Sequence, residues 1–177
     1  FNWTGAGGDT NWNTAANWSG GVAPSGTSVV VFNDTYCGAN CNSTIATSVD
    51  VKGIQMQSPY TGTVTQASGA ALTVGTRGWT QAAGIFTGSD AAVSVAGALS
   101  VSGGTYTATS NTTILNGALT IGAGVTFSHN NGSTVFAGST TRTLSLGGHP
   151  LYDVTFYPGG STGTTSFSGN LIVDRNL

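Results

Sequence analysis

The chain has 177 residues, of which 4 are Lys or Arg and 6 are Asp or Glu, so its formal net charge is -2. So few charges leave no basic field that could attract nucleic acid, and we expect no nucleic-acid partner. No apolar run approaches the about 20 residues needed to cross a bilayer, so we also expect no membrane-spanning segment. Ser, Thr, Asn and Gly dominate the remainder, which favours an extracellular or cell-surface location.

Residues 1–50 differ from the rest of the chain, and we expect them to form an N-terminal tryptophan-rich cap with a β region. Trp3, Trp12 and Trp18, three of the 4 tryptophans, lie in a polar, turn-rich stretch that precedes the strand-like run 28–32. A stack of repeated strands needs an atypical segment over its exposed end, and these rings would supply it.

The next feature is a pair of cysteines, Cys37 and Cys41, in the loop 36–42. A metal site built on thiolates would want four soft ligands, whereas two cysteines so close together favour a short disulfide. A disulfide implies an oxidising environment such as the cell exterior. The alternative is a pair of reduced thiols in a surface loop.

The centre of the chain repeats itself after a region of short strand-like runs between residues 49 and 74. Three segments align with one another at a constant interval, at 77–88, 97–108 and 117–128. Apolar residues in them alternate with Ser or Thr, which is the period of a strand with one buried face. The 28 glycines permit the tight corners of a winding chain.

These repeats predict an all-β fold, namely a parallel β-solenoid (β-helix) with coils of about 20 residues. One coil cannot cover its own apolar face, so stacked neighbours must build the core. We expect residues 1–50 to form the cap and residues 51–177 to form the coils, clearest over 77–138, as one continuous domain.

The C-terminal part differs again, because the period lengthens after Ser139 and nothing seals the last coil. The chain ends in an apolar run followed by a few polar residues, without a polar block or an amphipathic helix. An open strand edge recruits other strands, so we expect another subunit or a continuation of the chain to complete it. The candidate subunit contacts are Phe1, Trp3, Leu171, Ile172 and Val173.

Several stretches together resemble bacterial β-strand-repeat and autotransporter-like surface proteins. They are the opening Trp3–Trp12 and Ala16–Pro24, the later Phe127–Phe136 with its His-Asn-Asn-Gly sequence, and Tyr152–Phe156. The resemblance covers most of the chain and implies an exported β-helical adhesin, stalk, surface layer or fibre. It assigns no ligand.

The acidic residues do not offer the constellation that polysaccharide cleavage needs. Hydrolysis requires two carboxylates that converge on one bond, and Asp90 has no acidic counterpart one coil interval before or after it. Asp153 and Asp174 are separated by roughly one coil and could align on adjacent coils, joined by Arg175, but such a pair is more often a solvated ion pair. We therefore expect no enzymatic activity.

His129 and His149 are separated by one coil interval and could face the same metal ion. Two ligands without a nearby carboxylate or thiol do not make a site, and both histidines lie beside residues typical of turns. We expect neither a metal nor a cofactor.

The leading hypothesis is a structural subunit of an extracellular filament or fibre that self-assembles by β-strand pairing or terminal-strand exchange. Its main partner would then be a second copy of itself. The alternative is a stalk or glycan-binding segment of a larger secreted adhesin, in which Trp12, Trp18 and Trp79 stack on surface glycans. A polysaccharide lyase and an ice-binding protein rank lower, the latter because the outward residues of the repeats give an irregular row: Thr73, Ser100, Thr120 and Ser145.

Overall fold

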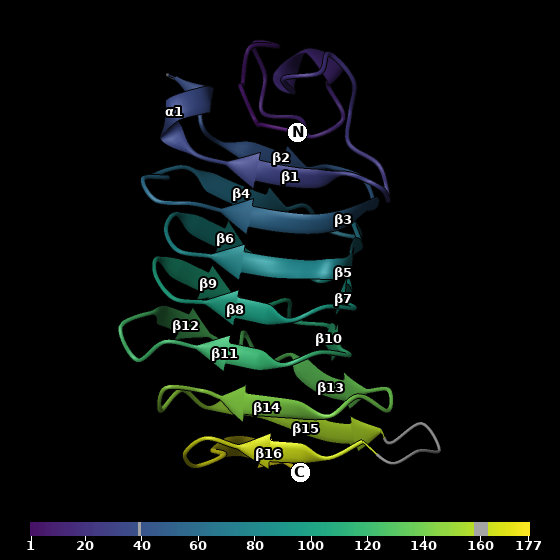
Figure 1. Cartoon of the computed structure of the whole chain (residues 1–177), viewed down its shortest axis with the longest axis vertical. Helices are drawn as coiled ribbons and strands as arrows, with labels where there is room; N and C mark the ends of the chain where they lie inside the picture. The colour runs from purple at the N-terminus through teal and green to yellow at the C-terminus, as the bar shows by residue number, and fades with distance from the viewer. Residues whose placement is uncertain (39, 158–162) are drawn as a thin grey trace.

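The computed structural model describes residues 1–38, 40–157 and 163–177 and shows a β-solenoid of about 7 turns with coils of about 21 residues. Figure 1 shows the coils stacked along the long axis, with the N-terminus at one end of the rod and the C-terminus at the other. All the paired strands are parallel to their neighbours in the stack. The predicted fold class is therefore confirmed.

Each regular coil has three sides, because a 12-stranded sheet covers two of them and a 5-stranded sheet covers the third. The larger sheet bends within β3 and β5, where the pairing shifts from one side to the next. Its strands are β1 (Val29–Phe32), β3 (Val49–Met56), β5 (Leu72–Gln81), β7 (Val93–Val95), β8 (Leu99–Val101), β10 (Thr112–Leu115), β11 (Leu119–Ile121), β13 (Ser133–Ala137), β14 (Arg142–Ser145), β15 (Leu151–Tyr157), β16 (Thr165–Phe167) and β17 (Val173–Asn176). The third side consists of β2 (Ser43–Ile45), β4 (Thr63–Gln66), β6 (Ile85–Thr87), β9 (Thr105–Thr107) and β12 (Thr126–Ser128).

The alternation seen in the sequence places every second side chain of a strand inside the coils, and these side chains are mostly apolar. Leu99 pairs in register with Trp79 on one side and with Leu119 on the other, and all three are buried. Behind the third side, the rings of Phe86 and Tyr106 lie 5.0 Å apart, and the ring of Phe127 follows at 6.1 Å. Stacking of identical positions therefore builds one continuous core along the rod.

The corners depend on glycine at a few positions. Gly84 and Gly104 stack in consecutive coils with φ of 75° and 78°, a backbone conformation that side chains disfavour. A Cβ at Gly104 would also collide with the carbonyl oxygen of Gly84. Gly124, one coil further on, has no positive φ, and a Cβ there would meet nothing within 4 Å.

The coils of the structure begin earlier than residue 51. The first strand of the stack is β1, which pairs with β3, and β2 pairs with β4. The boundary at residue 50 therefore lies inside the stack, because the run Val29–Phe32 already contributes a strand. The preceding residues contribute isolated bridges from Asn2 to β1 and from Asn11 to β2, a bridge between Trp3 and Trp18, and the short 3-10 helix η1 (Ala15–Asn17).

The short helix α1 (Asp34–Cys37) leads into the cysteine loop. Asn33 caps it, because its side chain accepts a hydrogen bond from the Thr35 amide. Cys37 and Cys41 lie at disulfide distance, with their Cα atoms 4.9 Å apart. The sequence prediction of a short disulfide agrees with this geometry.

Candidate functional site

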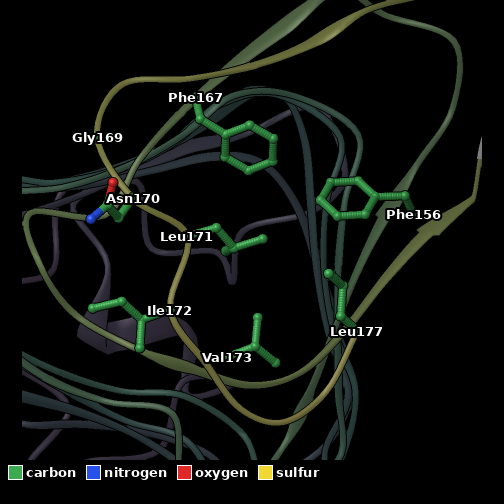
Figure 2. Close-up of a pocket in the computed structure, with 8 residues that line it drawn as sticks. All are labelled: Phe156, Phe167, Gly169, Asn170, Leu171, Ile172, Val173 and Leu177. Carbon is green, nitrogen blue, oxygen red and sulfur yellow. The ribbon is translucent and has the colours of Figure 1, made fainter.

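The C-terminal end of the rod exposes the apolar interior of the last coils. Phe156, Phe167, Leu171 and Val173 line an open hollow of about 840 Å³ together with Leu177. Figure 2 shows Phe167, Leu171 and Val173 pointing into this hollow. We call this surface the C-terminal face.

The exposed fractions on this face are large for apolar side chains. Phe167 is 45% exposed, Ile172 is 43% exposed and Leu177 is 80% exposed. In the described part of the chain, β16 and β17 are the two ends of the larger sheet at this face, and the outer edge of each has no partner strand. The face thus combines uncovered apolar side chains with backbone donors and acceptors that another strand could pair.

The third side of the solenoid stops before the other two sides. Among the residues that the structure describes, its last strand is β12, and the chain crosses the next coil through a turn that contains His149. The His149 ring lies 5.7 Å from that of Phe127. The turn with His149 therefore covers the last strand of this side without adding a further strand to it.

The N-terminal end is closed, in contrast. The rings of Trp12 and Trp18 lie 4.9 Å apart, and both contact Phe32 of the first strand, as Trp3 does. The Trp18 indole N–H donates to the Trp12 carbonyl oxygen at 2.6 Å, and Trp3 donates to the Asn40 carbonyl oxygen at 3.1 Å. These contacts seal the first coil with aromatic rings.

The burial of the tryptophans counts against the glycan-stacking hypothesis. Trp12 and Trp79 are 0% exposed, and Trp18 is 2% exposed. A ring inside the core has no face to offer a sugar. Trp3 is likewise buried and bridged to Trp18, so as a subunit contact it would require the cap to open.

The other proposed contacts lie at the surface to different degrees. Phe1 is 41% exposed, and its ammonium group donates to the Val29 carbonyl oxygen at 2.9 Å. Leu171 and Val173 are half-buried and Ile172 is exposed. The C-terminal set therefore lies together on one face, whereas Phe1 and Trp3 lie at the sealed end.

A polar groove follows one corner of the solenoid, where Asp90, Asp153 and Arg175 line the same hollow with Ser, Thr and Asn side chains. Sequence reasoning missed this alignment because it counted in steps of about 20 residues, whereas Asp153 lies three coils of about 21 residues after Asp90. Hydrogen bonds from Ser68 and the Gly69 amide hold the pKa of Asp90 below its ordinary value.

The two carboxylates of the groove lie on rows too far apart for joint catalysis. Asp90 precedes β7 and Asp153 belongs to β15, and β10 and β13 lie between these strands. Three strand spacings amount to about 14 Å, whereas paired glycosidase carboxylates lie at most about 9.5 Å apart. The groove does not place these two groups on one glycosidic bond.

Of the two contacts expected for Arg175, the structure shows the one with Asp153 but not the one with Asp174. Arg175 binds Asp153, which lowers the pKa of this carboxyl and raises that of the guanidinium. Asp174 instead lies 3.0 Å from His129, whose ring stacks on Tyr152. His129 and His149 have different partners, so the structure gives no support to a metal shared between them.

Comparison of the chain with family models, curated proteins and solved structures found no match. Among the described residues, no helix is long and apolar enough to cross a membrane.

Proposed function

We propose that this chain is a structural subunit of an extracellular assembly and that it associates with a second copy through the C-terminal face. The observation that carries the proposal is the contrast between the two ends of the rod. One end is sealed by aromatic rings, and the other presents unpaired strand edges around an apolar hollow.

The chemistry of the C-terminal face favours a β-rich partner over a small ligand. Its hollow is wide open, and its polar groups are mainly the backbone amides and carbonyls of strand edges. Such edges take up further strands, and apolar burial contributes about 25 cal/mol for each Å² removed from water. A second copy offers the same edges and the same apolar side chains, which an isologous contact requires.

The sealed end bears on the geometry of the assembly. Head-to-tail stacking needs a second open end, and the first strands are already bridged by Asn2 and Asn11 of the cap. Contact between two C-terminal faces displaces none of the described residues. Exchange of a terminal strand would also use this face. Reciprocal exchange would produce pairs of rods, and open-ended exchange, in which each copy donates its strand to the next, would produce longer polymers.

The test compares the wild-type chain with a variant in which Phe167 and Leu177 are both replaced by Lys. Both side chains are exposed, so their replacement leaves the core of the coils intact. Sedimentation should show concentration-dependent association of the wild type, weakened at least about tenfold in the variant. Val22→Lys at the sealed end is the matched control, since Val22 is 53% exposed and should behave as the wild type.

Electron microscopy of the same samples distinguishes the two geometries. Pairs of rods would show contact or reciprocal exchange between two C-terminal faces, and filaments would show open-ended strand exchange. A wild-type chain that stays monomeric at its highest soluble concentration would overturn the proposal.

A further inference from the structure

The third side of the solenoid carries two columns of outward side chains that are almost entirely threonine. The first column runs from Thr44 through Thr65, Thr87 and Thr107 to Ser128, and the strand pairing places these residues in register. The second column, also in register, consists of Thr63, Ile85, Thr105 and Thr126. We call the two columns the Thr face.

Most hydroxyl groups of this face are available to water. In the part of the chain that the structure describes, only the two ends of the first column make side-chain hydrogen bonds. The Thr44 hydroxyl lies 3.1 Å from that of Thr10, and the Ser128 hydroxyl accepts from the Asn130 amide. The threonines between them have hydroxyl groups that bind no other protein atom among the described residues.

The Thr face is also rigid and uncharged. β-branched threonine has a restricted χ1 angle, and each strand of the face is hydrogen-bonded to its neighbours in the sheet. Below it, Phe86 and Tyr106 are buried, and the buried Gln81 amide donates to the carbonyl oxygens of Gly84 and Thr105. β2, β4, β6, β9 and β12 contain no Asp, Glu, Lys or Arg.

The spacing of the array follows from sheet geometry. Neighbours in one column are separated by about 4.8 Å, and the two columns, whose members alternate with a buried residue along each strand, by about 6.7 Å. The result is a two-dimensional lattice of methyl and hydroxyl groups. A flexible chain or a single small molecule does not present groups at such regular intervals. A crystal surface with comparable repeats can contact all the side chains of the two columns at once.

We propose that the Thr face binds ice. Hydroxyl groups held at fixed positions can occupy hydrogen-bonding sites of the surface water layer, while the methyl groups and Ile85 disfavour liquid-like water between them. The fixed side chains lose little conformational entropy on contact, which is the advantage of a preorganised surface. A glycan partner would be favoured by exposed aromatic rings or carboxylates, which the described strands of this face do not display.

The finding corrects the expectation of an irregular threonine row. The residues considered for that row, Thr73, Ser100, Thr120 and Ser145, belong to β5, β8, β11 and β14 of the larger sheet. The regular columns lie on the other sheet. They were not apparent because the intervals vary: the step along the chain from Thr65 to Thr87 is longer than the step from Thr87 to Thr107.

The experiment measures thermal hysteresis and the uptake of the protein into slowly growing ice. The wild type should show a gap between melting and freezing that widens with concentration, together with enrichment in the ice fraction. Thr87→Tyr and Thr107→Tyr place a bulky ring at the centre of the lattice, and each should reduce both signals to the level of buffer. Ser100→Tyr is the matched control, because Ser100 is half-buried in the same coil but on a different side, and its signals should equal those of the wild type.

Circular dichroism and thermal unfolding establish that the variants fold, since the replaced side chains point outward. Absence of hysteresis and of uptake in the wild type would overturn the proposal. So would equal loss in the Ser100→Tyr variant, or binding to insoluble chitin or cellulose without any binding to ice. None of these outcomes depends on association through the C-terminal face, because Phe167→Lys with Leu177→Lys leaves the Thr face unchanged.

Discussion

Replacement of Trp12 by Ala tests whether the tryptophans seal the rod. Trp12 is 0% exposed, and its ring lies 4.9 Å from that of Trp18 and 5.7 Å from that of Phe32. Within the described residues its indole N–H has no hydrogen-bond partner, so the variant loses packing and no hydrogen bond from this side chain. Loss of a buried Trp side chain costs about 3–5 kcal/mol.

That cost is a large share of the about 5–15 kcal/mol that stabilises a typical domain. Urea unfolding followed by far-ultraviolet circular dichroism should therefore show a much lower urea midpoint for the Trp12→Ala variant than for the wild type. Addition of glycans should not change this difference. Val22→Ala, at an exposed position of the same region, should change the unfolding free energy by no more than about 0.5 kcal/mol. If Trp12→Ala shifts the midpoint no more than this control does, the rings do not hold the first coil together and the sealing argument fails.

Two further predictions concern a corner and a carboxylate. Gly104→Ala should lower the unfolding free energy by more than about 1 kcal/mol, because Gly104 has a positive φ and no room for a Cβ, whereas Gly124→Ala should leave it unchanged or raise it by about 0.4–1 kcal/mol. Equal effects in thermal unfolding would contradict this distinction. The pKa of Asp9 is lowered by hydrogen bonds from Thr14, Asn11 and Asn17, so its stabilising contribution is present above the ordinary Asp pKa of about 3.9 and is lost as the pH falls through the folded value. The unfolding midpoint of Asp9→Asn should thus depend less on pH below about 5 than that of the wild type, and parallel profiles would refute the assignment.

The solenoid could be predicted from the sequence because its cause is local and repeated. Alternation such as Leu99-Ser100-Val101 gives each strand one buried face. Because the same pattern recurs in the next coils, their strands bury the same face and can stack on it. The start of the coils was less visible. Val29–Phe32 is apolar throughout, so its sequence does not show which two side chains are buried, and only the pairing with β3 identifies it as the first strand.

The surfaces were harder to predict than the core, because they depend on register between coils. A small change in coil length moves a residue to another row, which concealed the columns of threonine. The pattern that could have revealed the columns is Thr-x-Thr around a buried apolar residue, as in Thr63-Val64-Thr65 and Thr105-Tyr106-Thr107. Strand pairing supplied the information that fixed intervals could not.

The two proposed surfaces are independent in geometry, and this separates their tests. The Thr face runs along the side of the rod, whereas the C-terminal face is perpendicular to the axis at one end (Figure 1). Association through the end would therefore leave the side of each copy uncovered. Two rigid Thr faces in one particle would bind a crystal with greater avidity than either alone, provided both can reach the same plane. We accordingly expect the variant with Phe167→Lys and Leu177→Lys to retain ice uptake, at a level no higher than that of the wild type. A complete loss would show that the end itself forms part of the ice-binding surface.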